Sequence, residues 1–262
     1  MRIYLAVTPD NLREASRWTK QLAHAAYRIG PDGHLTRQDP LRAQGGLMLL
    51  SDEGCGPIPD SRALCREIFR ECCTRGFSGV VADFTHPPST DRDAFLRFLA
   101  ALLQKNRMLL FTPETYACQN SSILICTAIS GGSFRRRLEE AVGRYGAARV
   151  ALDLQRLRMR FPLPCPGGEG IPLSAEELSV LQKELRPAVF YSADLCARYF
   201  TYSRDHKRYF VLFDDADTLL RKIRTAQELG IPNGFFMYPE VSDLLPELFP
   251  PRQNVSPTKN NR

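Results

Sequence analysis

The sequence predicts an α/β fold, a (β/α)8 TIM barrel in which eight parallel strands alternate with helices around one core. Short apolar runs alternate with longer amphipathic segments, which is the order expected when crossover helices join parallel strands. The chain has 262 residues, and one such barrel takes about 250. Eight apolar runs favour closure of the sheet. A doubly wound open sheet is the main alternative, although no G-x-G-x-x-G motif follows the first run.

The expected barrel strands are short apolar runs bounded by turn residues. They begin near Ile3, Ala25, Leu47, Val80, Met108, Ile123, Val150 and Phe235. We expect one domain over residues 1–249, with a small α+β insertion at about 155–214, between the seventh and eighth strands. The tail at 250–262 has no apolar pattern, so we expect it to be disordered.

Helices are expected where apolar residues recur every three or four positions. They span residues 11–26, 60–75, 91–105, 133–145, 174–185 and 215–229. Asp60 is suited to cap the start of the second helix, and Gly76 to end it. Asp91 is suited to cap the start of the third helix. Ser174 and Glu177 form a capping-box pattern. The aromatic-rich segment 190–213 predicts a pair of strands inside the insertion.

Composition argues against several classes of function. The chain carries 35 basic and 29 acidic residues, a net charge of +6. The arginines at 135–137 lie beside Glu139 and Glu140, which is typical of a solvated helix face, so no nucleic-acid partner is expected. No run approaches the roughly 18 apolar residues of a membrane span, and no apolar signal core follows Met1. We therefore expect no membrane association and a cytoplasmic location.

The cysteine pattern indicates free thiols. Eight cysteines are present without a C-x-x-C motif, and the four histidines are not interleaved with them at ligand spacing. Neither a zinc site nor a cofactor is therefore expected. Reduced thiols are the default in a reducing compartment.

Polar residues that follow barrel strands are the candidates for a functional site, because chemistry in this fold lies at the C-terminal strand ends. The candidates are Asp83, Thr85, Glu114, Asp153, Tyr238 and Glu240. Several of them have a simpler structural interpretation. Asp83 could cap the following loop, Asp153 could pair with Arg156 or Arg158, and Tyr238 could simply pack at the barrel top.

Residues 76–87, GFSGVVADFTHP, resemble the fourth-strand signature D-G-x-D-x-D-x-E of family 18 chitinase-like glycoside hydrolases. Residues 27–35 resemble the second-strand turn of the family's spore-type members. Residues 209–226 and 234–238 resemble its insertion end with the seventh helix, and its last strand. The resemblance implies a barrel with an α+β insertion. It also implies a carbohydrate ligand containing N-acetylglucosamine, of the chitin or peptidoglycan type.

The departures from the family pattern concern catalysis. Thr85 stands where the family has the glutamic acid that protonates the leaving oxygen, and a threonine hydroxyl is too weak an acid for that role. Ser78 and Val81 replace the first two aspartates of the signature. Asp83 matches the aspartate that orients the substrate's N-acetyl group, which is the family's nucleophile. The family's sixth-strand M-x-Y-D is also missing, since its position holds CTAI at 126–129.

Loss of a general acid typically costs about 10²–10⁴-fold in rate. The sequence therefore predicts a catalytically impaired barrel that binds a glycan, with Asp83 or Glu114 as the catalytic candidates. An active hydrolase could have moved its acid to Glu114, Asp153 or Glu240, given two carboxyls about 5–9.5 Å apart. An enzyme of another class on the same fold is the third alternative.

Overall fold

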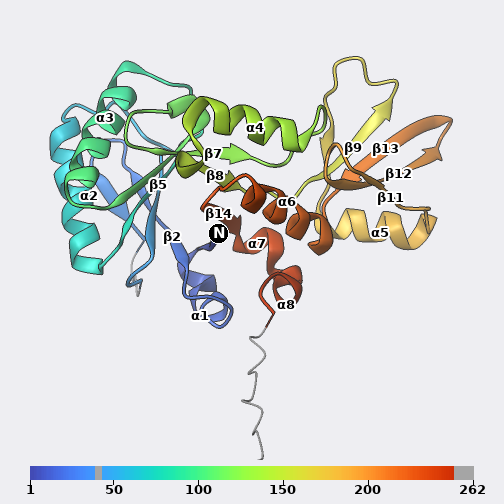
Figure 1. The fold of residues 1–262 in the computed structure, drawn as a ribbon, viewed down its shortest axis with the longest axis horizontal. Helices are drawn as coiled ribbons and strands as arrows, with labels where there is room; N and C mark the ends of the chain where they lie inside the picture. The colour runs from blue at the N-terminus through green and yellow to red at the C-terminus, as the bar shows by residue number, and fades with distance from the viewer. Residues whose placement is uncertain (39–42, 251–262) are drawn as a thin grey trace, which may run out of the picture.

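Eight parallel strands form a closed barrel (Figure 1). The structure is a computed structural model that describes residues 1–38 and 43–250. The strand order is β1-β14-β8-β7-β6-β5-β4-β2, and β2 pairs back onto β1. The strands are β1 (Arg2–Val7), β2 (Leu22–Ile29), β4 (Leu47–Ser51), β5 (Gly79–Asp83), β6 (Leu109–Pro113), β7 (Ser122–Cys126), β8 (Val150–Asp153) and β14 (Asn233–Met237). The predicted (β/α)8 barrel is confirmed. A short strand, β3 (Leu35–Arg37), pairs antiparallel with β2.

Four long helices lie outside the barrel strands (Figure 1). They are α2 (Ser61–Arg75), α3 (Thr90–Lys105), α4 (Phe134–Tyr145) and α6 (Ala216–Glu228). Asp60 begins α2 as predicted, accepting hydrogen bonds from the N–H groups of Arg62 and Ala63, both at 2.9 Å. Gly76 ends it with a φ of 66°, in the left-handed region that favours glycine. The remaining helical turns are η1 (Pro9–Asn11), η2 (Glu114–Tyr116), η3 (Ala147–Arg149), α7 (Tyr238–Val241), η4 (Ser242–Leu244) and α8 (Leu245–Leu248).

Two helix predictions are wrong. The predicted helix at 11–26 is only one turn, α1 (Leu12–Ala15), because β2 already begins at Leu22. Leu22 pairs with Leu5 of β1, and this pairing closes the barrel, so tertiary pairing overrides the local helical spacing. The N-cap of α3 is Ser89 rather than Asp91, whose carboxylate instead accepts the N–H of Ile58 at 3.1 Å.

The chain between β8 and α6 forms a second sheet beside the barrel (Figure 1). Its antiparallel order is β10-β9-β13-β12-β11. The strands are β9 (Arg158–Leu163), β10 (Ile171–Pro172), β11 (Phe190–Ser192), β12 (Ala197–Arg204) and β13 (Lys207–Phe213). Helix α5 (Ala175–Leu185) begins with the predicted capping box of Ser174 and Glu177. Leu178 and Leu181 of α5 pack against Phe200 and Val211 of the sheet.

The barrel interior is filled by side chains up to its C-terminal mouth. Phe235 lies at the centre of this packing, with its ring 5.0 Å from Tyr4 and 4.8 Å from Phe111, centroid to centroid. Interior-facing residues of neighbouring strands, including Leu49, Val81 and Ala151, complete the cluster. The barrel interior is therefore a packed core up to the level of Phe235.

Across residues 1–38 and 43–250, no helix is long and apolar enough to cross a membrane. The predicted disordered tail at 250–262 lies outside the described residues, except for Pro250.

Candidate functional site

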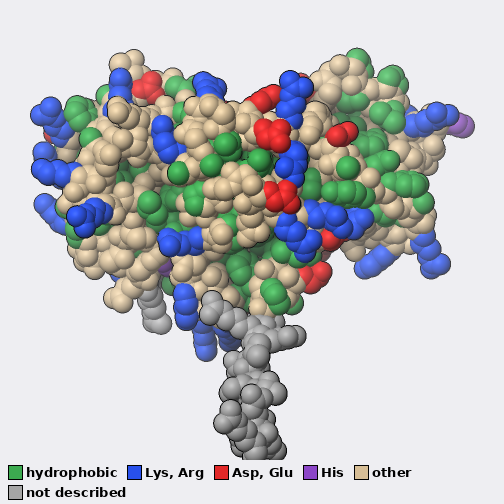
Figure 2. All heavy atoms as spheres, in the orientation of Figure 1, with side chains coloured by type: hydrophobic (Ala, Val, Ile, Leu, Met, Phe, Trp, Pro, Cys, Tyr) green, Lys and Arg blue, Asp and Glu red, His purple; other side chains and the backbone are tan. Residues whose placement is uncertain are grey.

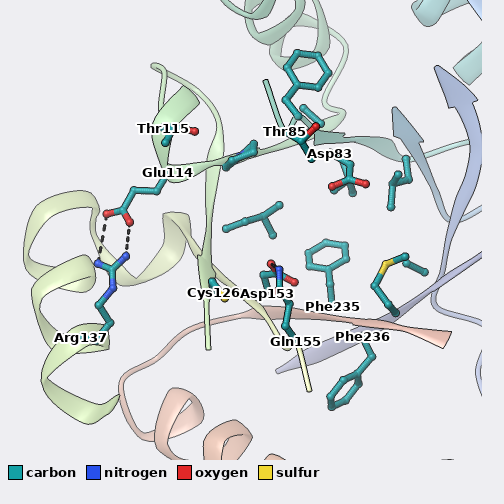
Figure 3. A pocket seen from close by; sticks show the side chains of 18 residues that line it. Asp83, Thr85, Glu114, Thr115, Cys126, Arg137, Asp153, Gln155, Phe235 and Phe236 are labelled. Carbon is teal, nitrogen blue, oxygen red and sulfur yellow. Dashed lines mark hydrogen bonds and ion pairs between the residues drawn. The ribbon is translucent and has the colours of Figure 1, made fainter. Parts of the chain in front are cut away.

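A cavity of about 400 Å³ opens at the C-terminal mouth of the barrel (Figure 3). Its floor is apolar and includes Leu49, Val81, Leu124, Phe235 and Met237. A volume of this size and an apolar lining with few polar groups are typical of small-ligand sites. The position agrees with the general placement of active sites in this fold.

Asp83 and Asp153 both point into this cavity (Figure 3). Alternate residues of a barrel strand face inward. Val81 and Ala151 belong to the interior cluster, so Asp83 and Asp153, two positions further along the same strands, face inward as well. The structure therefore brings together two carboxyl groups that lie 70 positions apart in the sequence.

Neither carboxyl group has a cationic partner among the described residues. Asp83 makes no hydrogen bond or ion pair there, and Asp153 accepts one hydrogen bond, from Nε2 of Gln155 at 2.7 Å. Burial raises the pKa of Asp153 to about 6, and the nearby charges of Asp83 and Glu240 add to the effect. Burial, followed by repulsion from Asp52, also raises the pKa of Asp83. Both groups therefore hold protons more strongly than an ordinary aspartate.

The predicted ion pair between Asp153 and a neighbouring arginine is absent from the described part of the chain. Arg156 turns away and donates from Nη1 to Asp243 Oδ1 at 2.6 Å and to the carbonyl oxygen of Glu240 at 3.0 Å. Asp153 is thus left facing the cavity.

Thr85 lines the cavity and is held there mainly through its backbone. Its N–H donates to Asp52 Oδ1 at 2.9 Å, whereas its hydroxyl lies 3.4 Å from the same oxygen. Asp52 is fully buried and also accepts from the backbone N–H of His86 at 3.3 Å. The Nδ1 of His86 and the Nε of Arg92 lie 3.0 and 3.4 Å from Asp52 Oδ2. Asp52 therefore fixes the loop after β5 without supplying an acid to the cavity.

Glu114 lies at the cavity rim and is already engaged (Figure 3). Its carboxylate is paired with the guanidinium of Arg137 from α4, and the Tyr145 hydroxyl lies 3.5 Å from its Oε1. The ion pair holds Glu114 toward α4 and away from the two aspartates. Glu114 is consequently a poor candidate for a proton donor to a ligand on the cavity floor.

The structure does not bring Tyr238 or Glu240 into the cavity lining. Tyr238 is 6% exposed and packs in the outer cluster between strands and helices. Glu240 borders a second cavity of about 340 Å³ beside the insertion, where its Oε2 accepts the backbone N–H of Arg156 at 3.2 Å. Gln155 lines both cavities, so the second lies directly beside the barrel mouth.

Sequence reasoning did not select most of the cavity lining, including Cys126, Arg137, Gln155 and Phe235. Strand alternation shows only that Phe235 and Tyr238 point to opposite sides of the last strand, and sequence reasoning selected the one that faces outward. Arg137 was interpreted as part of a solvated helix face, and nothing local distinguishes it from its neighbours. Within the described residues, no group of three or more His, Cys, Asp or Glu side chains could hold a metal ion.

The comparisons with known proteins concern the fold. No model of a known protein family matches the sequence. No curated protein matches it either. Solved structures do match. The spore cortex-lytic enzyme SleL of Bacillus megaterium QM B1551 is 18% identical, with a TM-score of 0.63 over 95% of this chain and 74% of that one.

Two chitinases have a similar fold. The enzyme from Chromobacterium violaceum ATCC 12472 is 14% identical, with a TM-score of 0.65 over 95% of this chain and 98% of its own. A class V chitinase from Nicotiana tobaccum in complex with NAG4 is 12% identical, with a TM-score of 0.65 over 88% and 92% of the two chains. At these identities the similarity shows the fold. The chain has the barrel fold that SleL and these chitinases share, which agrees with the fold that the sequence resemblance implied.

Proposed function

We propose that this protein is a catalytically impaired, glycoside hydrolase-like barrel that binds a glycan containing N-acetylglucosamine, of the chitin or peptidoglycan type. One observation carries the proposal. Asp83 faces an apolar cavity at the barrel mouth, while Thr85 stands at the position where the family resemblance requires an acid.

The cavity has the groups that a sugar would use. Asp83 can accept a hydrogen bond from an amide N–H or a hydroxyl group, and Gln155 offers both a donor and an acceptor. Phe235 provides an aromatic surface on the floor. The fold neighbours, which include a chitinase in complex with NAG4, support a carbohydrate as the ligand.

Impairment is supported by the state of the remaining acids near Thr85. Asp52 accepts hydrogen bonds from the backbone of Thr85 and His86, and Glu114 is paired with Arg137. Neither carboxylate is free to replace the missing glutamic acid beside Asp83.

The test is binding and turnover of N-acetylglucosamine oligomers, by calorimetry and product analysis, on the wild type and Asp83→Ala. We expect binding without cleavage, weakened by about tenfold or more in the variant because a hydrogen bond to a charged acceptor is lost. Asp194→Ala, which removes an exposed carboxylate from the turn before β12, is the matched control and should bind like the wild type. Failure of the wild type to bind would remove the proposal.

Asp153 favours a second candidate function, an active glycoside hydrolase with a relocated acid. With its pKa raised to about 6, Asp153 is partly protonated near neutral pH and can act as a general acid. Cleavage of the oligomers by the wild type, abolished in Asp153→Asn, would establish this alternative in place of the impaired barrel.

A further inference from the structure

We propose that the cavity selects a sugar unit whose amino group is free and protonated, so that the preferred glycan is at least partly de-N-acetylated. This inference rests on the proposed function, because it assumes that a sugar occupies the cavity. It concerns which chemical form of the sugar the cavity prefers. The observation that carries it is the pair Asp83 and Asp153, which line one cavity and form no ion pair with a cationic side chain of the described residues (Figure 3).

The charges that line the cavity do not balance. Its lining includes three carboxyl groups and one guanidinium group, those of Asp83, Glu114, Asp153 and Arg137. Arg137 and Glu114 neutralise each other at the rim. Asp83 and Asp153 remain, and no lysine, arginine or histidine of the described residues forms an ion pair with either of them. When both are ionised, the cavity has two uncompensated negative charges above an apolar floor.

An ammonium group fits this arrangement better than an amide does. Carboxylates are acceptors only, and an ammonium offers three donors together with a positive charge. It can donate to either aspartate and offset the negative charge of the cavity, whereas an N-acetyl amide offers one N–H and no charge. Both donors make charge-assisted hydrogen bonds to a carboxylate, but only the ammonium adds a direct attraction between opposite charges. Burial raises the pKa of both aspartates, and a bound cation would oppose that effect by favouring their ionised forms.

Non-specific attraction does not explain such a preference, because the whole chain has a net charge of +6. On the face shown in Figure 2, acidic and basic side chains are interspersed near the junction of barrel and insertion. A cationic oligomer is therefore repelled by the average charge of the protein and attracted only where carboxylates are unpaired.

The experiment compares two tetramers of equal length, one of N-acetylglucosamine and one of glucosamine, by calorimetry at neutral pH. The proteins are the wild type, Asp83→Asn and Asp153→Asn. Asparagine keeps the shape and one acceptor oxygen but removes the charge. The matched control is Asp205→Asn, which removes the same charge from the exposed turn between β12 and β13, where the φ of 53° suits asparagine.

We expect the glucosamine tetramer to bind the wild type about tenfold more tightly than its acetylated counterpart. Each cavity variant should lose about tenfold or more of that affinity while changing the binding of the acetylated tetramer by about threefold or less. Asp205→Asn should behave like the wild type. Added salt should weaken only the binding of the glucosamine tetramer, because only that ligand is charged.

The other outcomes separate the two proposals. Equal or tighter binding of the acetylated tetramer overturns the amine preference and leaves the proposed function intact. Glucosamine binding that survives both cavity variants lies elsewhere and also overturns the inference. If neither tetramer binds the wild type, the proposed function fails and the inference fails with it.

Discussion

The barrel mouth and the junction between insertion and barrel differ in how their carboxyl groups are partnered. At the junction, Asp214 is 1% exposed and its Oδ2 accepts from Lys222 Nζ at 2.7 Å and from the N–H of Leu157 at 3.0 Å. Its Oδ1 accepts from the Thr218 hydroxyl at 2.8 Å. At the mouth, Asp83 is exposed and Asp153 is half-buried. Asp153 accepts one hydrogen bond, from Gln155, and Asp83 accepts none from the described residues.

The difference indicates what each region does. Lys222 also donates to the carbonyl oxygen of Thr127 at 3.1 Å, so the junction cluster joins the start of β9, helix α6 and the end of β7. Buried charges are stable only when they are paired and hydrogen-bonded, and this cluster meets both conditions. The carboxyls at the mouth have no ionic partner among the described residues, and the pKa of each is raised. This combination is typical of a ligand site rather than of a structural ion pair.

The largest expected effect comes from breaking the partnered cluster. Lys222→Met removes the cation but keeps the length of the side chain, leaving Asp214 buried and uncompensated. We expect the free energy of unfolding to fall by about 3–5 kcal/mol, measured by denaturant titration. Lys183→Met on the exposed face of α5 is the control and should stay within about 0.5 kcal/mol of the wild type. A loss below about 1 kcal/mol for Lys222→Met would contradict the structural role of the cluster.

At the barrel mouth, removing the charge of a carboxyl group should instead increase the free energy of unfolding. The pKa of Asp153 rises from 3.8 to about 6 on folding, so ionising it costs the folded state up to about 3 kcal/mol. Below the unfolded pKa both states are protonated and the cost is absent. It appears as pH rises and is complete above the folded pKa. Allowing for partial exposure to solvent, Asp153→Asn should stabilise the protein by about 1–2 kcal/mol at pH 8 and leave it unchanged near pH 4.

Denaturant titrations at the two pH values measure this directly, with Asp205→Asn as the exposed control. If Asp153→Asn changed the free energy of unfolding equally at both pH values, the stability difference from the wild type would arise from packing and not from charge. Destabilisation at pH 8 would mean that Asp153 has a stabilising partner after all.

The smallest effect is expected at Thr85. Its N–H bond to Asp52 survives substitution, and only the long hydroxyl contact of 3.4 Å is lost. Thr85→Val should therefore change the free energy of unfolding by about 0.5 kcal/mol or less. The thermal unfolding midpoint provides the check. A large loss of stability would show that the hydroxyl group, and not the backbone, anchors the loop after β5.

The sequence by itself determined the barrel and most of its helix ends. Eight apolar runs located all eight strands, and local patterns identified Asp60 and Gly76 as the ends of α2. These predictions succeeded because strand alternation and helix capping depend on residues close together in the chain. The prediction of a helix at 11–26 failed because barrel closure, a long-range interaction, decides that segment.

Only the tertiary structure decided which candidate residues form one site. The sequence selected Asp83 and Asp153 as strand-end carboxylates, and folding placed them in the same cavity. Folding also paired Glu114 with Arg137 and buried Tyr238 in the outer cluster. A sequence lists the ionisable groups, but their charge compensation depends on which side chains face one another across the barrel. That arrangement arises from the closure of the sheet.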